Sequence, residues 1–449
     1  MTRTSVRTPR KTGVKVGIIG LGFVGLSLAA VLSSRNIPVV GIETDFVKFS
    51  KIIRGNPPFY EPGLKKMLKN SLKKHLVVST DISLLEKCDF IFVSVGTPQK
   101  NDGGIDLSHI KKSVSDIGKL LSKSKKQPII IIKSTVTPKT TQNVIIPILE
   151  QKSKKTCGKE FGLITNPEFL RESKAIDDTQ NPHVIVLGGS KTKFMNKLKN
   201  FYSSFNKSVP IFVTNYQTAE LIKYANNSFL ATKISFINQL ANICQNIPET
   251  NIDDISRIIG LDPRIGNLFL NAGPGYGGSC LPKDVKALIN FSSKVGTAPT
   301  LLNAVEKINE RQLSNVISLM KKTLGNIKSK NISILGTAFK PDTDDVRDSV
   351  AIELIKKLLK MKANVRIHDP KAIENTKRVL GDRIEYSNTI NDALKNSHCV
   401  VIMTRWKMYE ELNNNSIKNM RKKLIIDCRR VLVNKKLVAD YHAIGIGKN

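Results

Sequence analysis

Long apolar runs, paired cysteines and clustered histidines are all missing from this sequence. No apolar run reaches the length of a membrane-spanning helix. The six cysteines are scattered without a CxxC pair, which argues against a disulfide framework and a zinc site and favours reduced thiols. The six histidines show no HExxH or other metal-ligand spacing. We therefore expect a cytoplasmic protein with no metal site and no membrane span.

Acidic residues are also scarce, with 37 Asp and Glu against 71 Lys and Arg, for a formal net charge of +34. One interpretation is a nucleic-acid or anionic-membrane partner. The other is a lysine-rich surface combined with a polyanionic substrate. Lysines occur in nearly every segment and not in one stripe with interleaved aromatics, so we favour the second interpretation and do not expect nucleic acid as a partner. A single continuous positive face would favour the first.

The first 13 residues form the most concentrated basic segment, with Arg3, Arg7, Arg10 and Lys11. This segment has no apolar centre, so it does not resemble a secretory signal. We expect it to be a disordered basic tail.

A dinucleotide-binding pattern follows the tail. Residues 14–19 predict a buried strand, residues 20–25 read GLGFVG, and an apolar helix continues to Leu32. A second strand is predicted over 38–42 and ends at Glu43. The glycines allow a tight turn and close approach to a pyrophosphate. An acid at this position binds the ribose hydroxyls and repels the extra phosphate of NADP, so the pattern predicts NAD.

The pattern of buried strands continues, and a chain of 449 residues is too long for one core. The sequence predicts further strands over 90–95, 129–133, 161–165 and 184–187, with polar loops at their carboxyl ends where ligands bind in such sheets. A long helix is predicted over 216–244. From Asn331 a weak internal repeat of the first lobe begins, without its GxGxxG; its strands are predicted over 332–335, 364–367, 400–403 and 424–426.

These elements predict an α/β fold: two Rossmann-like, doubly wound lobes joined by a long central helix and a helical region. We expect the active site in the cleft between the lobes, and a nucleotide bound by the second lobe through other means than a glycine fingerprint. The expected division is a tail over 1–13, an NAD-binding domain over 14–213, a central helical domain with the cysteine loop over 214–325, and a second Rossmann-like domain over 326–449.

The segment 275–284, GYGGSCLPKD, carries the most specific chemical signal. It places Cys280 where a turn becomes a helix, and Pro282 suits the first helical turn. The helix dipole and Lys283 both favour the thiolate. Asp284 lies four residues after Cys280, on the same helix face. The segment suggests covalent catalysis on a ligand held by backbone groups; the alternative is a glycine turn that precedes a helix with an inert, structural cysteine.

At this point the chain resembles the nucleotide-sugar dehydrogenases, the UDP-glucose/GDP-mannose dehydrogenase family, in the branch that contains UDP-glucose 6-dehydrogenase. The resemblance covers about residues 15–433. It rests on ordered motifs: GLGFVG, YEPGL, KSTVTP, NPEFLRES, ELIKYANNSFLATKISFIN, GPGYGGSCLPKD, GTAFKPDTDDVRDS, TRW and DCR. The family oxidises the sixth carbon of a sugar from alcohol to aldehyde to acid and reduces two NAD molecules at one site.

The resemblance implies a role for each residue that matches a family catalytic residue. Cys280 would be the nucleophile that traps the aldehyde as a thiohemiacetal, which is then oxidised to a thioester. Lys223 and Asn227, one helical turn apart, would stabilise the oxyanion. Glu168 would be the general base for hydrolysis of the thioester. Asp284 would assist the first proton removal through water, and Thr135 would hold that water network. Taken singly, each of these residues could have a purely structural role: Glu168 could cap a helix, and Lys223 could be one more solvent-exposed lysine.

The resemblance also implies that the domain over 326–449 is the UDP-sugar-binding domain and that the central domain over 214–325 contains a helical dimerisation region. It further implies two sets of binding residues and a homodimer. Those expected to bind NAD are Gly20, Gly22, Phe23, Val24, Gly25, Glu43, Thr97, Thr135 and Glu172. Those expected to bind the UDP-sugar are Glu168, Phe169, Leu170, Lys174, Lys223, Asn227, Arg264, Tyr276, Gly277, Gly278, Lys340 and Arg429. Arg264 resembles an arginine that reaches a neighbouring subunit's site, so the resemblance implies a dimer built around the central helix.

A few positions depart from the family pattern. Gln239 stands where the family usually has glutamate, and Ser173 stands where it usually has glycine. Residues 182–184 lack an arginine that is often found before the strand. Residues 138–140 lengthen the segment after Thr135 relative to the common STVP-x-GT pattern. None of these removes a chemical group from the mechanism.

The substrate follows from the blocks around Cys280 and Glu168. Ser279 and the NPEFLRE block indicate UDP-glucose or GDP-mannose, and GPGYGGSC resembles the UDP-glucose type more. The resemblance therefore implies oxidation of UDP-glucose to UDP-glucuronate for polysaccharide or glycan synthesis. The alternatives are a UDP-N-acetylhexosamine or GDP-mannose as substrate, a nucleotide-sugar sensor without turnover, and a basic nucleic-acid-binding protein on a relic Rossmann fold.

Overall fold

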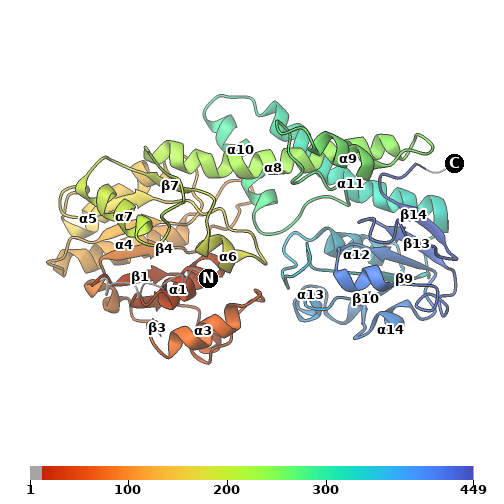
Figure 1. The fold of residues 1–449 in the computed structure, drawn as a ribbon, viewed down its shortest axis with the longest axis horizontal. Helices are drawn as coiled ribbons and strands as arrows, with labels where there is room; N and C mark the ends of the chain where they lie inside the picture. The colour runs from red at the N-terminus through yellow and green to blue at the C-terminus, as the bar shows by residue number, and fades with distance from the viewer. Residues whose placement is uncertain (1–12, 448–449) are drawn as a thin grey trace, which may run out of the picture. The chain divides into compact units, whose positions relative to one another are not determined.

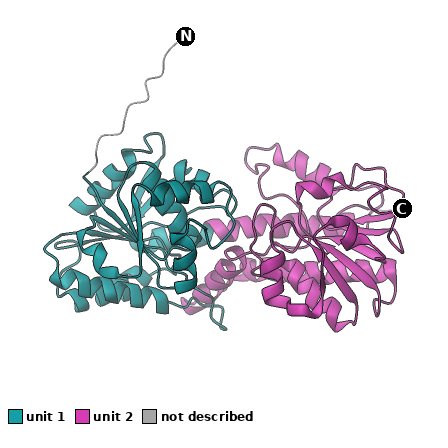
Figure 2. Cartoon of the chain, turned by 90° about the horizontal axis from the view of Figure 1, so that it is seen from below, with its two compact units in different colours: residues 1–225 teal, residues 226–449 magenta. Residues whose placement is uncertain are grey.

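The computed structural model describes residues 13–447, which form two compact units (Figures 1 and 2). Unit 1 ends at Ala225 and unit 2 begins at Asn226. The basic tail expected over 1–13 lies, apart from Gly13, outside the described residues. Each unit contains one sheet with helices on its faces.

The sheet of unit 1 has eight strands in the order β3-β2-β1-β4-β5-β6-β7-β8. Neighbouring strands pair in parallel, except for a single antiparallel pair of residues between β6 and β7. The strands are β1 (Val16–Ile19), β2 (Val39–Ile42), β3 (Leu76–Ser79), β4 (Phe90–Val93), β5 (Ile129–Ile132), β6 (Gly162–Thr165), β7 (Ile185–Gly188) and β8 (Ile211–Thr214). The first six have the doubly wound order of a dinucleotide-binding sheet.

The central strands of this sheet are apolar throughout because helices cover both faces. Strand β5 consists of four isoleucines: Ile129 and Ile131 belong to one core, and Ile130 and Ile132 to the core on the opposite face. The covering helices are α1 (Phe23–Ser34), α2 (Phe46–Ile53), α3 (Leu64–Leu72), η1 (Ile82–Lys87), α4 (Ser108–Lys123), η2 (Thr141–Ile145), α5 (Ile146–Ser153), α6 (Ala175–Gln180) and α7 (Lys193–Ser203).

Helix α8 (Tyr216–Cys244) begins in unit 1 and continues into unit 2, where three further helices follow it. These are α9 (Ile252–Gly260), α10 (Leu281–Lys294) and α11 (Thr300–Leu324). The carboxyl-terminal part of α8 packs through Ile237 and Ala241 in one core with α9, α11 and the second sheet. Figure 1 shows α9 and α11 beside this part of α8.

The second sheet repeats the topology of the first on a smaller scale. Its six strands are all parallel, in the order β11-β10-β9-β12-β13-β14. They are β9 (Asn331–Leu335), β10 (Asn364–His368), β11 (Glu385–Tyr386), β12 (Cys399–Ile402), β13 (Leu424–Asp427) and β14 (Asp440–Ala443). The accompanying helices are α12 (Val350–Lys360), α13 (Ile373–Leu380), η3 (Gly381–Arg383), α14 (Ile390–Leu394) and η4 (Lys407–Glu411).

The α/β fold class with two Rossmann-like sheets is therefore confirmed, and every strand predicted from the sequence forms. Over residues 13–447, no helix combines the length and apolar character that a membrane span requires.

Candidate active site

The loop between β1 and α1 has the geometry of a pyrophosphate site. Gly20 adopts a φ of +86°, which favours glycine. A Cβ on Gly25 would lie 2.0 Å from the carbonyl oxygen of Gly20, so no other residue fits there. A Cβ on Gly22 would meet no atom within 4 Å, so this side of the loop is open to a ligand. Phe23 and Val24 start α1, whose free N–H groups suit a phosphate.

Glu43 closes the other side of this site. It directly follows β2 and is 7% exposed. One carboxylate oxygen accepts from the backbone N–H of Leu21 at 3.0 Å, and the other accepts from Asp45 at 2.9 Å. These bonds orient the carboxylate, and each oxygen keeps a lone pair for a ribose hydroxyl. Thr97 lies at the carboxyl end of β4 and is almost fully buried. These residues fit NAD.

Glu168 and Lys223 form a buried ion pair in unit 1. The Lys223 ammonium lies 3.0 Å from the Glu168 carboxylate, and the two side chains are 5% and 8% exposed. The other Glu168 oxygen accepts from the backbone N–H of Leu170 at 2.5 Å. Burial alone would raise the pKa of Glu168, but the charge and hydrogen bond of Lys223, with the Leu170 N–H, lower it below its usual value. Glu168 is therefore ionised at neutral pH.

Two further residues surround this pair. The ring of Phe169 lies 5.6 Å from the Lys223 ammonium and 5.5 Å from the His183 ring. Lys133, which directly follows β5, lines one cavity together with Glu168 and Phe169. Burial lowers the pKa of Lys133 to about 8, against the opposing influence of Glu168. Lys133 was not among the residues predicted from the sequence, although a lysine placed directly after four isoleucines at the carboxyl end of a strand is a signal for it.

Thr135 lies half-buried in the loop that follows β5. The end of this loop is held by Glu220 of α8, a residue that the sequence analysis did not single out. One Glu220 oxygen accepts from the backbone N–H of Thr141 at 2.8 Å, and the other has no hydrogen-bond partner among the described residues. Burial raises the pKa of Glu220 to about 7, and the bonds from Thr141 and Lys139 only partly oppose it.

Glu220 should make unit 1 less stable as the pH rises. Its carboxyl holds a proton more tightly in the folded protein than in the unfolded chain, so stability is lost between about pH 4.5 and the folded pKa of about 7. The loss reaches at most about 3 kcal/mol in the free energy of unfolding. In Glu220→Gln this loss is absent, so the difference in melting temperature between pH 5.5, which lies within the transition, and pH 8, which lies above it, should shrink.

The control for this measurement is Glu353→Gln, because Glu353 is half-exposed on α12 in unit 2. The melting temperatures of both variants and the wild type at the two pH values test this prediction. An unchanged pH difference in Glu220→Gln would contradict the prediction.

Cys280 lies at the amino end of α10, where its thiol is exposed. Its sulfur lies 3.5 Å from the Ser279 hydroxyl. Asp284, one turn further along α10, is 1% exposed and accepts from the Asn227 amide of α8 at 2.7 Å. Lys283 pairs with Asp284 at 2.6 Å, so its charge is directed at that carboxylate. The position of Cys280 at the start of α10 therefore favours its thiolate form, as expected from the sequence. Lys283 contributes less to this effect than expected, because its charge is paired with Asp284.

The glycine loop before Cys280 packs closely on the segment that follows β9. A Cβ on Gly277 would lie 2.2 Å from the carbonyl oxygen of Asp348, so only glycine permits this approach. The Gly278 N–H donates to the Arg347 carbonyl at 3.1 Å. The backbone of Tyr276 is held on both sides by the Asn309 side chain of α11, with distances of 2.8 and 3.1 Å. The loop is therefore preformed and rigid.

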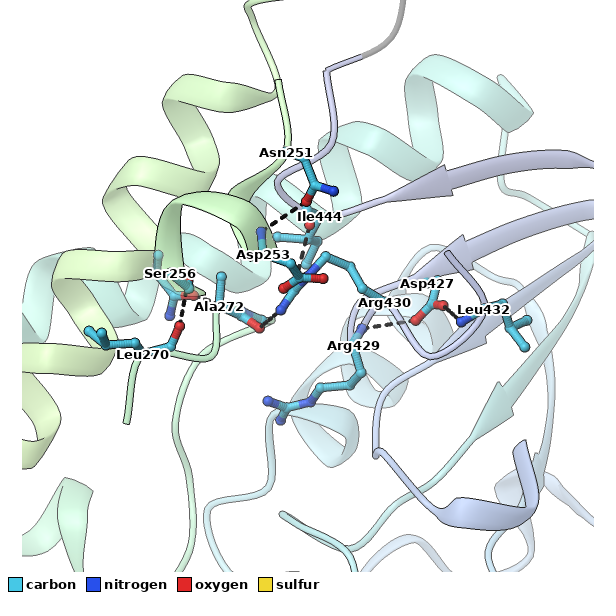
Figure 3. A network of polar contacts seen from close by, with 12 residues as sticks. Asn251, Asp253, Ser256, Leu270, Ala272, Asp427, Arg429, Arg430, Leu432 and Ile444 are labelled. Carbon is cyan, nitrogen blue, oxygen red and sulfur yellow. Dashed lines mark hydrogen bonds and ion pairs between the residues drawn. The ribbon is translucent and has the colours of Figure 1, made fainter. Parts of the chain in front are cut away.

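Lys340 and Arg429 follow the carboxyl ends of β9 and β13 in unit 2. The Lys340 ammonium lies 5.8 Å from the ring centre of Phe339. The Arg429 side chain donates to the Met403 carbonyl at 2.9 Å, and its other N–H groups have no partner among the described residues. Burial lowers the pKa of Arg429 to about 10, so the group stays charged at neutral pH. Figure 3 shows its side chain leaving the turn after Asp427.

The remaining predicted residues lie on the surface or partly buried. Lys174 is exposed, Leu170 and Glu172 are half-buried, and Arg264 pairs with Asp262 at 2.6 Å with 87% of its side chain exposed. Within residues 13–447, no group of three or more acidic, histidine or cysteine residues is placed to hold a metal ion.

The second sheet has no free acid equivalent to Glu43. Asp369, which directly follows β10, accepts from the backbone N–H groups of Thr337 and Ala338 at 2.8 and 3.0 Å and from Trp406 at 3.2 Å. Its other oxygen accepts from two more backbone groups. This carboxylate is fully used in holding its own loops, so unit 2 does not repeat the NAD site.

Comparison with known proteins places this geometry in a family. The chain matches three models of the UDP-glucose/GDP-mannose dehydrogenase family: the NAD binding domain over residues 14–206, the central domain over 217–311 and the UDP binding domain over 333–434. Three such matches cover most of the chain.

Individual relatives agree over nearly the full length. The chain is 37% identical to UDP-glucose 6-dehydrogenase TuaD of Bacillus subtilis, covering 96% of this chain and 93% of that protein. It is 39% identical to a UDP-glucose 6-dehydrogenase of Rickettsia conorii, covering 96% and 99%. A UDP-glucose dehydrogenase structure from Pyrobaculum islandicum superposes with a TM-score of 0.90 at 32% identity, covering 98% of each chain. The chain belongs to the UDP-glucose/GDP-mannose dehydrogenase family and carries the family's NAD-binding domain.

Proposed function

We propose that this protein oxidises the C6 alcohol of UDP-glucose to the carboxylate of UDP-glucuronate in two NAD-dependent steps. The observation that carries the proposal is the exposed thiol of Cys280 at the amino end of α10, next to a rigid glycine loop and one turn from the buried Asp284. The names of the relatives support UDP-glucose as the substrate. We also propose a cytoplasmic location, supported by the scattered positions of the six cysteines in the sequence, which include no CxxC pair.

The first oxidation removes two hydrogens from C6. The hydroxyl proton passes to a water held by Asp284 and Thr135, and the C6 hydrogen leaves with its electron pair. NAD, when bound, takes up the electrons and the hydrogen that leave C6 in each oxidation. The product is an aldehyde, whose carbonyl oxygen faces the cationic and amide donors Lys223 and Asn227.

The second oxidation depends on Cys280. Its thiolate adds to C6, a sulfur–carbon bond forms, and the carbonyl electrons move to oxygen as a thiohemiacetal. The remaining C6 hydrogen then leaves with its electron pair, and the carbonyl re-forms as a thioester. Lys223 and Asn227 stabilise the oxyanion at this stage.

Hydrolysis completes the reaction. Glu168 takes a proton from water, the resulting hydroxide adds to the thioester carbon, and the carbon–sulfur bond breaks to return the thiolate. Because Glu168 is ionised beside Lys223, it is ready to accept that proton. The acid leaves as a carboxylate.

The UDP group is proposed to bind to cations and backbone groups. Lys340 and Arg429 suit the diphosphate, since Arg429 has free N–H donors. The loop from Tyr276 to Gly278 wraps the sugar, and Phe169, Leu170 and Lys174 complete the substrate side. For NAD we propose Gly20, Gly22, Phe23, Val24, Gly25, Glu43, Thr97, Thr135 and Glu172.

The experiment that tests this function is a count of NADH formed per sugar consumed. The purified protein is mixed with NAD and, separately, UDP-glucose, UDP-N-acetylglucosamine, UDP-N-acetylmannosamine and GDP-mannose. We expect two NADH per UDP-glucose. Two NADH per another sugar would keep the mechanism and correct the substrate, and no NADH with any of them would contradict the proposal.

We also propose a homodimer built around α8 and α9. On α8, Phe229, Phe236 and Ile243 follow one another at seven-residue spacing, and all three are about half-exposed or more. The adjoining α9 region exposes Ile258, Leu261, Ile265 and Leu268. A concentration of exposed apolar side chains is typical of a protein interface. Arg264 lies within this region, which suits its proposed reach to a neighbouring subunit.

Substitution of Phe236 by glutamate should split this dimer. A charge at the centre of an apolar interface loses its hydration without a partner and weakens association by at least about 100-fold. Light scattering after size exclusion should give twice the 49.8 kDa chain mass for the wild type and the chain mass for the variant. Val438→Glu, at an exposed apolar residue elsewhere in unit 2, is the control. A wild type of single-chain mass would refute the dimer.

A further inference from the structure

Two consecutive arginines, Arg429 and Arg430, follow β13 and have opposite environments. Asp427 holds their turn by accepting from the backbone N–H of Arg429 at 3.0 Å and of Leu432 at 2.8 Å. Arg429 keeps free donors, whereas the side chain of Arg430 is 2% exposed. Arg430 has a φ of +54°, a left-handed conformation that costs energy for a residue other than glycine. Its burial therefore needs an explanation.

Arg430 joins three segments of unit 2 that are distant in sequence. Its guanidinium donates to the Asp253 carboxylate of α9 at 2.7 Å, to the Ala272 carbonyl at 2.9 Å and to the Ile444 carbonyl at 3.3 Å. Figure 3 shows these acceptors around one guanidinium. The planar group fits several acceptors in fixed directions, which a lysine ammonium cannot copy.

The Ala272–Gly273 peptide is the start of the segment that leads to Cys280. The Gly273 N–H donates to Asn238 of α8 at 2.7 Å, and its carbonyl accepts from Gln312 of α11 at 2.9 Å. Both amide side chains are essentially buried. Arg430 supplies the one charged anchor among these contacts.

The same peptide also supports Arg429. A Cβ on Gly273 would lie 2.7 Å from a terminal guanidinium nitrogen of Arg429, so the two groups are in direct packing contact. The guanidinium proposed to meet the diphosphate therefore rests on a peptide that Arg430 holds in place. A shift of about 1 Å at such a support is enough to weaken a bidentate phosphate contact.

We propose that Arg430 is a positioning residue of the UDP-sugar site, which sets the place of Arg429 and of the start of the Cys280 loop through the Ala272–Gly273 peptide. The proposal rests on the proposed function, in that it takes Arg429 as a ligand of the diphosphate. It assigns Arg430 no contact with the substrate.

The test compares Arg430→Lys with the wild type by calorimetric titration of UDP and by steady-state kinetics. We expect the Kd for UDP and the KM for UDP-glucose to rise by about tenfold, with kcat within about threefold and the KM for NAD unchanged. The titration separates the two possible roles, because its stoichiometry reports the folded fraction and its Kd reports the site. A purely structural role would lower the stoichiometry and leave the Kd alone.

Two more variants sharpen the test. Asp253→Asn keeps the arginine and removes its charged partner, and should weaken UDP binding in the same direction by a smaller factor. Arg366→Lys is the matched control, since Arg366 of β10 also donates to one carboxylate and two carbonyls, away from the loop. It should leave the Kd unchanged.

The outcomes separate the inference from the proposed function. A wild type that binds UDP, with Arg430→Lys binding equally well, would overturn the inference alone. An equal loss in Arg366→Lys would also overturn it, because the effect would then be general to the sheet. A wild type that does not bind UDP would overturn the proposed function together with the inference.

Discussion

Replacement of Cys280 by serine is expected to lower the formation of UDP-glucuronate by at least about 1,000-fold. A serine hydroxyl is far less ionised than a thiol at neutral pH and forms the covalent adduct with the aldehyde poorly. The first oxidation needs no nucleophile, so the variant should stop after it. The measurement is NADH per UDP-glucose, together with chromatographic assay of the acid. Undiminished turnover would refute the assignment of the nucleophile.

The variant should fold normally, which makes its loss of activity interpretable. Cys280 is exposed, and substitutions at exposed sites change stability by about 0.5 kcal/mol or less. Calorimetric binding of UDP should therefore be retained. Cys157→Ser is the matched control: Cys157 is half-buried in unit 1, and burial raises the pKa of its thiol to about 11, so it should not matter for turnover.

Replacement of Lys223 by methionine is expected to abolish activity and to destabilise unit 1 by about 3 kcal/mol. The change leaves the Glu168 carboxylate, which is 8% exposed, with the Leu170 N–H as its main remaining bond. This loss of stability lies at the lower end of the range for a broken buried ion pair, because the positive charge of Lys133 remains near Glu168. The pKa of Glu168 should rise, because the Lys223 charge and hydrogen bond that lower it are gone. Urea denaturation and NADH assays measure the two effects.

The double variant Lys223→Met with Glu168→Gln separates stability from catalysis. Removing both charges takes away the unpaired carboxylate, so most of the lost stability should return. Activity should not return, because both the oxyanion donor and the base are then missing. A double variant no more stable than the single one would show that the ion pair does not account for the destabilisation.

Some missed features of the fold have one physical cause. Each sheet contains two strands that the sequence pattern did not indicate: β3, β8, β11 and β14. These four are the edge strands of the two sheets. An edge strand is partly exposed, so its sequence does not need to be apolar: β11 reads EY and β14 reads DYHA. Strands β3 and β8 read LVVS and IFVT, so they are apolar in sequence although each is exposed at one residue, and their apolar pattern was overlooked. The central strands, covered on both faces, carry a continuous apolar signal.

The residues of the candidate site also fall into a group that was predicted from the sequence and a group that was missed. Motif spacing identified the residues of the glycine loops, Glu43 and Cys280, because their roles depend on local backbone geometry that a few neighbouring residues determine. Lys133, Glu220 and Arg430 were missed. Their importance depends on partners that are distant in sequence: Arg430, for example, contacts Asp253, 177 residues earlier.

By itself, the sequence determined the fold class, the family and the NAD-binding loop, since hydrophobic periodicity and short motifs are local properties of the chain. Only the tertiary structure decided which charges are buried and with whom they pair. It directed Lys223 to Glu168 and Arg430 to the Ala272 carbonyl. The reason is physical: the charge state and orientation of a polar group depend on burial and on contacts made through space, and neither can be read from neighbours along the chain.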